Sequence, residues 1–561
     1  MKRVALVLIL LILTTSAFVW HKMGEGSNEI VIDVSNLCPS NLTITSYLES
    51  STTFEYSSFV EMLFFENGTI RANETLTLKN VGNVSIGRVA ISYLYPAIKI
   101  RTLKLRNAKL ISASVSQGKD VIYLTFEPLK GKTAEITLDY EFNWKNTLPS
   151  GLGFFGALIN QSLIDKEETI LTSMYFPFVA LKGTKTNNAL ILKLPIDWWG
   201  FVVDSSSYTP WKFVNSEVST NQRILHFEQE NRSFPLILIG RFDRFAKTLS
   251  LREKSVNLTV YMPLNEREKG ETVLLQVEDI VEIFSRWYGI YPYDSLNVVI
   301  SRLIRPHSGL NVGGSFVLVS AGGYDGWLLS HEISHSWFEA YVDLGRMSES
   351  LATFSAMAYV LTRSEDVPFD FLDFSENISM KQNISLASAY RASLSQREMY
   401  PIVYRKGGFV FRSLQFVLGN ETFFKGLRQV VNECHYISCG VSRIQEIFEN
   451  VSNQDLDWFF DEWFYSARVP DYKVKNLTIV QNNGKCLLTF EVVDESNFTI
   501  PLEIKVETDK GSTVKRIWIE REARVSIECE GNPVTVILDP CDWIINKNTE
   551  YQISGVKIVI E

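Results

Sequence analysis

The chain has 561 residues, of which 46% are hydrophobic and 21% charged, and its formal net charge is −9. This composition is that of a folded globular protein and excludes a disordered chain. One hydrophobic core does not grow to this length, so we expect about two to four domains. The acidic balance excludes a nucleic-acid binder, which would present a basic surface.

The first 25 residues differ in character from the rest of the chain. Met1-Lys2-Arg3 is positively charged and precedes an almost wholly apolar run from Val4 to Trp20. Such a segment is typical of a secretory signal peptide or of a single membrane anchor, and a buried first helix is the alternative. We therefore expect residues 1–25 to direct the chain out of the cytoplasm or to hold it at a membrane.

Sequons and cysteines also indicate an extracytoplasmic location. The chain carries thirteen Asn-X-Ser/Thr sequons, against roughly five expected from composition, which predicts a glycoprotein. The six cysteines lack the spacing of a zinc knuckle, so disulfides are the better interpretation. Cys434 and Cys439 are close enough to pair, whereas the partners of the others stay open. The six are Cys38, Cys434, Cys439, Cys486, Cys529 and Cys541.

Strand patterns dominate residues 30–264. Segments 75–78 and 121–126 are rich in β-branched and aromatic residues, and turn residues such as Asn67-Gly68 recur between such runs. We predict an N-terminal β-sheet domain over residues 30–264.

Helical periodicity replaces this pattern from residue 265. Residues 265–470 are expected to form a helix-rich domain, and residues 471–561 a small C-terminal β-sandwich-like domain, so the fold class is multidomain α+β. The predicted helices are 268–288, 327–342, 348–363, 407–418 and 456–464, and the predicted strands are 296–300, 315–320, 475–480, 486–492 and 534–538.

The strongest chemical motif is His331-Glu332-Ile333-Ser334-His335. Residues four apart lie on one face of a helix, so both imidazoles can bind one zinc ion. Glu332 is not a ligand in this arrangement and can accept a proton from the attacking water. The alternative is a pair of core histidines that bind no metal.

A catalytic zinc takes a third protein ligand, for which Glu339, Asp343 and Glu349 are candidates. Glu339 continues the same helix about 6 Å beyond His335, too far along the axis to close the site. Asp343 falls in a connector that does not orient it. Glu349 opens the next helical run, so we expect it to be the ligand; a helix N-terminal acid is its alternative role.

This motif, followed by Ser348-Glu349-Ser350-Leu351-Ala352, resembles the gluzincin aminopeptidases of the M1 type, the group that includes leukotriene A4 hydrolase. The resemblance implies a thermolysin-like catalytic domain with one zinc ion, in which Tyr404 stabilises the oxyanion. Tyr400 is a weaker candidate for that role. Further segments similar to family landmarks are 175–177, 234–240, 287–293, 403–408 and 455–463.

The chain departs from the family pattern in three respects: the spacing of the metal ligands, the amine-binding motif and the C-terminal domain. The family usually places eighteen residues between the second histidine and the glutamate, whereas this chain places thirteen. The Gly-X-Met-Glu-Asn motif, which binds the substrate amine, aligns with residues 309–313, so Val312 replaces its glutamate. Glu168 falls where the family often has a second anchor. The large helical C-terminal domain of many relatives is replaced by β character. We expect Glu168, Gly313 and Gly314 to bind substrate.

These features predict a zinc aminopeptidase that removes N-terminal residues from extracellular peptides. Val312 and a more open cleft favour a second hypothesis, an endopeptidase or broad peptidase. A third is a surface binding protein on an inactive peptidase scaffold, against which the intact set of candidate catalytic residues argues.

Overall fold

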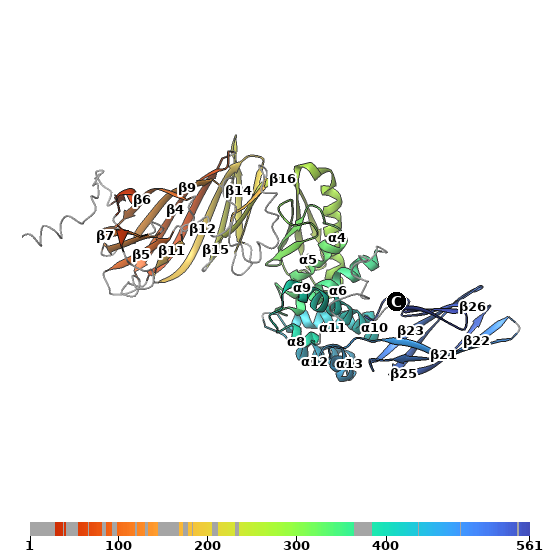
Figure 1. The fold of residues 1–561 in the computed structure, drawn as a ribbon. Coiled ribbons are helices and arrows are strands. Elements are labelled where there is room, and N and C mark those ends of the chain that lie inside the picture. Colours follow the sequence, from red (N-terminus) through yellow and green to blue (C-terminus); the bar gives the residue numbers. More distant parts are fainter. Residues whose placement is uncertain are drawn as a thin grey trace, which may run out of the picture.

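The computed structural model describes residues 29–560 except 38, 41–53, 66, 81–85, 93–97, 118–120, 130–132, 144–167, 172–177, 182, 205–210, 231–234, 364–383, 436, 483 and 547–548. The predicted order of a β region, a helical region and a second β region is confirmed, and Figure 1 shows the helices between the two β regions.

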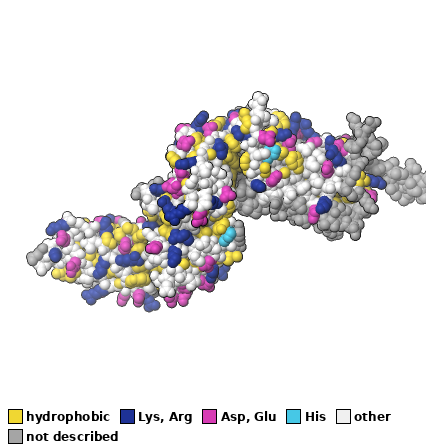
Figure 2. Space-filling model, turned by 180° about the vertical axis from the view of Figure 1, so that it is seen from behind, with side chains coloured by type: hydrophobic (Ala, Val, Ile, Leu, Met, Phe, Trp, Pro, Cys, Tyr) yellow, Lys and Arg dark blue, Asp and Glu magenta, His cyan; other side chains and the backbone are white. Residues whose placement is uncertain are grey.

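On the face drawn in Figure 2, basic and acidic side chains are interspersed. In the part of the chain described, no helix is both long and apolar enough to span a membrane. The segment 1–25 and Cys38 lie outside that part.

Two sheets form most of the N-terminal region. One has eight strands in the order β1-β6-β9-β4-β3-β12-β15-β14, and the other has five in the order β11-β5-β8-β7-β2. Buried and part-buried residues alternate along β9, as expected for a strand with one face on the core. The strands are β1 (Glu29–Ile32), β2 (Pro39–Ser40), β3 (Phe54–Phe64), β4 (Thr69–Asn80), β5 (Gly87–Ser92), β6 (Lys99–Arg106), β7 (Ala108–Ser116), β8 (Val121–Pro128), β9 (Ala134–Asn143), β11 (Phe178–Leu181), β12 (Gly183–Pro195), β14 (Lys212–Val218) and β15 (Gln222–Glu230).

A third sheet joins this region to the helices. Its strand order is β10-β16-β17-β18-β20-β19, with β13 also paired to β16, so it runs across the predicted boundary at residue 264. β19 lies at the edge of this sheet and pairs antiparallel with β20. The strands are β10 (Glu168–Leu171), β13 (Trp198–Asp204), β16 (Pro235–Ser250), β17 (Ser255–Pro263), β18 (Ser295–Ser301), β19 (Gly309–Val312) and β20 (Phe316–Ser320).

The helices pack on this sheet and on one another. Helix α5 (Gly326–Phe338) contacts both α6 (Met347–Thr362) and strand β19. Unlike an amphipathic surface helix, α5 is buried on nearly all sides. The other helices described in this region are η5 (Leu264–Lys269), α4 (Gly270–Tyr288), α8 (Leu386–Ala389), α9 (Gln396–Met399), the π-helix η7 (Tyr400–Lys406), α10 (Gly407–Leu418), α11 (Asn420–Glu433), α12 (Val441–Ser452) and α13 (Asp457–Trp463), and the N-terminal region contains the short η1 (Val34–Asn36).

The C-terminal region is a path of eight strands in the order β21-β22-β25-β24-β23-β26-β28-β27. A single residue pair, Glu520 with Glu522, connects β24 to β25, and both halves of the path contribute to one core. The strands are β21 (Tyr472–Asn482), β22 (Lys485–Asp494), β23 (Thr499–Thr508), β24 (Gly511–Glu520), β25 (Glu522–Glu530), β26 (Pro533–Leu538), β27 (Thr549–Ile553) and β28 (Val556–Ile560).

This region docks on α10. Arg412 donates from Nε to the carbonyl of Asp542 at 2.6 Å and from Nη2 to the carbonyl of Cys541 at 2.7 Å. Ser413 donates to the carbonyl of Trp543 at 3.0 Å, and the Trp543 ring stacks on Phe416. The buried residues of the helical and C-terminal regions form one continuous hydrophobic cluster, so the two regions share a core.

Two disulfides bond described cysteines. The predicted pair Cys434–Cys439 is confirmed, and Cys486 pairs with Cys529 between β22 and β25. Cys541 is exposed and has no disulfide partner among the described residues.

The predicted helices and strands are found with shifts of a few residues, with two differences. The helix predicted over 327–342 ends at Phe338, because Glu339 leaves helical geometry with φ −133°. The glycine-containing segment 309–312, which we did not predict as a strand, forms β19. Glycine is unfavourable in a strand interior, and here it allows the close approach of another side chain.

Candidate metal centre and active site

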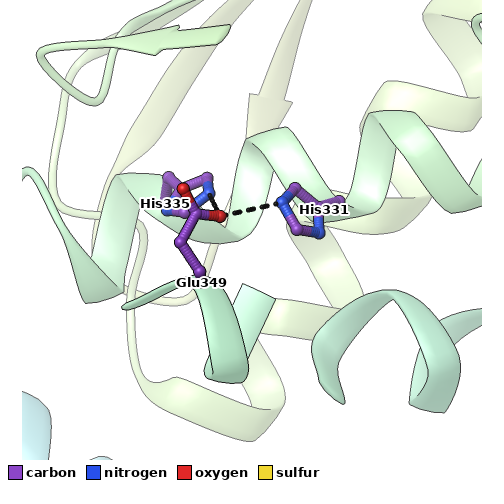
Figure 3. Close-up of side chains that lie close together, drawn as sticks. All are labelled: His331, His335 and Glu349. Atoms are coloured by element: carbon purple, nitrogen blue, oxygen red, sulfur yellow. Dashed lines mark ion pairs between the residues drawn. The ribbon is translucent and has the colours of Figure 1, made fainter. Parts of the chain in front are cut away.

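Helix α5 carries both histidines of the motif. The Asp325 side chain caps the helix by accepting a hydrogen bond from the Leu328 amide at 2.9 Å. His331 and His335 lie one turn apart, are buried, and place their ring centroids 5.2 Å apart. Both rings face helix α6, which packs along α5 (Figure 3).

Glu349, in the first turn of α6, completes the group. Its Oε2 atom lies 3.3 Å from Nε2 of His331 and 3.4 Å from Nε2 of His335 (Figure 3). Ligand atoms of all three residues lie within 4.8 Å of one another. The structure thus brings the three predicted ligands together from two helices.

The spacing of these atoms fits a metal ion. In tetrahedral coordination with bonds of about 2.0–2.1 Å, neighbouring ligand atoms lie about 3.3–3.4 Å apart. The two measured separations, 3.3 and 3.4 Å, agree with this value. Two imidazoles and one carboxylate are also the ligand set of catalytic zinc sites that leave a position for water.

The electrostatics of the group favour a cation at its centre. Burial by itself raises the pKa of the Glu349 carboxyl, but the adjacent imidazoles outweigh this and hold it well below its usual range. Burial lowers the pKa of His335, yet Glu339 and Glu349 together raise it well above its ordinary value. A positive charge between these groups, proton or metal, is therefore strongly stabilised.

Glu339 and Asp343 are not part of the ligand group. Oε2 of Glu339 lies 2.9 Å from Nδ1 of His335, the ring nitrogen that does not face Glu349. A carboxylate there orients the ring and increases the basicity of the other nitrogen. Asp343 lies in the connector and accepts a hydrogen bond from the Gly345 amide at 3.1 Å. The exclusion of both residues from the ligand set agrees with this geometry.

Glu332 is buried beside the three predicted metal ligands, against the edge strand β19. Burial is the main reason that the pKa of its carboxyl is raised, which suits a group that takes up and releases a proton. A Cβ atom at Gly309 would come within 2.6 Å of Glu332 Cγ. Gly309 therefore leaves the space that the Glu332 side chain occupies.

Tyr404 comes from the π-helix η7 and lies beside His331. Its ring is almost parallel to that of His331, at 6.0 Å between centroids and 8° between planes. Burial first, and then the hydrogen-bonded Glu349 carboxylate, raise the pKa of Tyr404, so its hydroxyl stays protonated and can donate a hydrogen bond. Tyr400, the weaker candidate, is 45% exposed.

The π-helix follows from a proline in its first turn. Pro401 has no amide hydrogen for the regular helical ladder, and residues 400–406 take wider turns before α10 begins. Such turns occur frequently at functional sites, where they redirect a side chain.

Asn311 connects the edge strand β19 to helix α5 by hydrogen bonds. Its Nδ2 donates to the carbonyl of Glu332 at 2.8 Å and to Oγ of Ser336 at 3.2 Å, and its Oδ1 accepts from the Gly314 amide at 2.8 Å. The carbonyl of Gly314 accepts from the hydroxyls of Tyr291 and Ser336. This buried network of hydrogen bonds fixes the position of strand β19 against helix α5.

Of the residues predicted to bind substrate, the structure describes Gly313 and Gly314, but only the backbone of Glu168. Gly313 and Gly314 form the turn between β19 and β20 with φ of 60° and 79°. Val312 is buried in an apolar cluster with Phe201 and Phe316. The backbone of Glu168 pairs with Gly240 in β16, and its side chain lies outside the described residues. The roles of Glu168, Gly313 and Gly314 stay predictions.

Sequence reasoning did not predict the contacts through which three residues shape the site. Glu339 follows His335 at i+4, and this spacing could have predicted the contact with its ring. Gly309 and Asn311 carry no such local signal, because their contacts depend on how β19 lies against α5.

Residues 327–463 match the family model described as Peptidase family M1 domain. Among curated proteins, Tricorn protease-interacting factor F2 of Thermoplasma acidophilum is 25% identical over 220 residues, 36% of this chain and 27% of the relative. Its counterpart in Thermoplasma volcanium is 24% identical over 201 residues, 33% of this chain and 25% of the relative. The chain thus spans about a quarter of the length of these relatives.

Two solved structures are similar to this chain to different extents. Aminopeptidase A of Legionella pneumophila is 14% identical, with a TM-score of 0.50 over 91% of this chain and 61% of that one. The M1 zinc metallopeptidase of Deinococcus radiodurans is 13% identical, with a TM-score of 0.45 over 75% of this chain and 96% of that one. Identities this low indicate a shared fold only.

A buried lysine follows Tyr404 in the same helical run. Nζ of Lys406 donates to the carbonyls of Ser466 and Arg468, both at 3.1 Å, and its side chain is 3% exposed. Burial lowers the pKa of this amine from its ordinary value of 10.5 to about 8.

This amine should make stability depend on pH. Between pH 8 and pH 10.5 the unfolded chain holds a proton that the folded chain has released, so the free energy of unfolding rises with pH across this window. We expect a gain of about 1–3 kcal/mol, measured by urea denaturation, and its absence in Lys406→Met. Equal pH slopes for the two proteins would contradict the assignment.

Proposed function

We propose, from the premise that residues 327–463 belong to the M1 peptidase family, that this chain is a zinc-dependent aminopeptidase. The observation that carries the proposal is the group of His331, His335 and Glu349, in which the carboxylate lies 3.3 and 3.4 Å from the two imidazole nitrogens, as between ligands of a tetrahedral zinc ion.

The surrounding residues support peptide hydrolysis. A zinc ion held by the three ligands would supply Lewis acidity and lower the pKa of water at the site. Glu332, whose raised pKa suits proton transfer, accepts the proton of the attacking water and returns it to the leaving amine. Tyr404, protonated and stacked beside His331, donates a hydrogen bond to the oxygen on which negative charge develops.

Variants of these two residues test the proposal. Glu332→Gln should lose about 10²–10⁴-fold in kcat/KM, because an amide cannot accept the proton. Tyr404→Phe should lose about 10²–10³-fold through the missing hydrogen bond. Both should retain one zinc per chain by elemental analysis. Tyr465→Phe, an exposed tyrosine outside the site, is the matched control. Absence of zinc and of hydrolysis in the unaltered protein would overturn the proposal.

A second candidate is a peptidase without strict recognition of a free amine. The position aligned with the family's amine-binding glutamate is Val312, which is buried among apolar side chains and offers no charge. This leaves Glu168 as the remaining acidic candidate for binding the substrate amine.

Matched peptides with free and acetylated N-termini distinguish the two candidates. An aminopeptidase should hydrolyse only the free peptides, and Glu168→Gln should then raise KM for them by about tenfold, the effect of a lost charge-assisted hydrogen bond. Comparable kcat/KM for free and acetylated peptides would favour the second candidate and exclude Glu168 as an amine anchor.

We also propose that the chain is glycosylated and acts outside the cytoplasm, secreted or anchored through residues 1–25. Two disulfides support this, because such bonds persist in oxidising compartments. Sequon asparagines at accessible positions also support it; those described as exposed are Asn67, Asn257, Asn420, Asn450, Asn476 and Asn497.

Mass spectrometry of peptides from the natively expressed protein tests the modification. We expect glycan masses on peptides that contain exposed sequons, and recovery of the protein in the membrane or secreted fraction. Unmodified sequons together with a cytoplasmic location would contradict this proposal and leave the enzymatic one intact.

A further inference from the structure

The connector between the two metal-binding helices is short. Residues Glu339 to Arg346 alone link the end of α5, which carries both histidines, to the start of α6, which carries Glu349. Any shift of this connector moves one side of the metal group relative to the other. Its conformation is therefore directly linked to the 3.3 and 3.4 Å separations at the site.

Several hydrogen bonds support the connector locally. The amide of Val342 donates to the carbonyl of Trp337 at 3.0 Å, and the amide of Ser348 donates to the carbonyl of Gly345 at 3.1 Å. Gly345 has φ 53°, a backbone conformation that favours glycine. The Gly345 amide also donates to the Asp343 side chain at 3.1 Å, so local bonds reach the middle of the connector, Tyr341 to Asp343, as well as its ends.

A loop distant in sequence contacts this middle segment. The loop from Cys434 to Cys439 joins α11 to α12 and is closed by a disulfide between two buried cysteines. His435 forms a β-bridge with Val342, and its ring stacks on Tyr341 at 4.0 Å between centroids and 16° between planes. The amide of Cys439 donates to the carbonyl of Asp343 at 3.0 Å. Three consecutive connector residues thus have a partner in the disulfide loop.

We propose that the Cys434–Cys439 loop is a positioning element for the metal site, which holds the connector so that Glu349 faces the two histidines. The proposal rests on the metal site of the proposed function. The disulfide restricts the loop to few conformations, so His435 and the Cys439 amide are presented to the connector without a large entropic cost. Metal coordination is sensitive to displacements of a few tenths of an ångström, so loss of this restraint should weaken binding.

The alternative is that the disulfide stabilises only the junction of α11 and α12. Its loss would then lower the stability of the metal-free and metal-bound protein equally, and would leave the zinc affinity of the folded protein unchanged. Metal affinity, measured well below the melting temperature, distinguishes this structural role from positioning.

The test compares two cysteine-pair variants. Cys434→Ala/Cys439→Ala should bind zinc about tenfold more weakly than the unaltered protein in competition with a chelator, the scale of effect of lost outer support for a ligand. The visible spectrum of its cobalt-substituted form, which reports ligand geometry, should also change. Cys486→Ala/Cys529→Ala removes a disulfide between β22 and β25, away from the connector, and should preserve both affinity and spectrum.

His435→Ala provides an independent test that keeps the disulfide. It removes the ring stack on Tyr341 and should weaken zinc binding in the same direction, so it decides the question if the cysteine variant does not fold. Unchanged zinc affinity in folded variants would overturn the proposal. Absence of zinc binding by the unaltered protein would instead overturn the proposed function.

Discussion

Two buried imidazoles and one carboxylate converge at His331, His335 and Glu349, with separations that bring their lone pairs toward one point. Such groups destabilise a folded protein unless a cation satisfies them together. Two observed features support this arrangement: α6 packs along α5, and Glu339 forms an ion pair with His335. The proposed restraint of the connector by the Cys434–Cys439 loop would support it further. Glu332 and Tyr404 can take part in the proposed chemistry only because they lie beside these three residues.

The domains around the site restrain it from several directions. Strand β19 is tied to α5 through Asn311, so the edge of the sheet cannot move independently of the catalytic helix. Tyr404 lies in a helical run that continues into α10, and Arg412 of α10 binds the C-terminal region. The C-terminal β region therefore helps to fix the helix that carries Tyr404, although it contributes no residue to the metal group.

The departures from the M1 pattern are distributed unevenly. The three predicted metal ligands converge, with Tyr404 stacked beside His331, even though the connector is five residues shorter than is usual in the family. In the segment that aligns with the family's amine-binding motif, Asn311 takes part in a structural network, and Val312 belongs to an apolar cluster.

The sequence by itself determined the parts that depend on local periodicity. The four-residue spacing of His331 and His335 placed both rings on one helix face, the short loop from Cys434 to Cys439 allowed one disulfide, and runs of β-branched and aromatic residues indicated the β regions. Only the tertiary structure decided that Gly309–Val312 forms an edge strand, that Cys486 pairs with Cys529, and that the Cys434–Cys439 loop contacts the connector. The physical reason is that these features depend on contacts with other segments: Cys486 and the connector meet partners far along the chain, and the short strand 309–312 depends on pairing with β20 and packing on α5. Spacing within one segment does not show which other segment will pack against it.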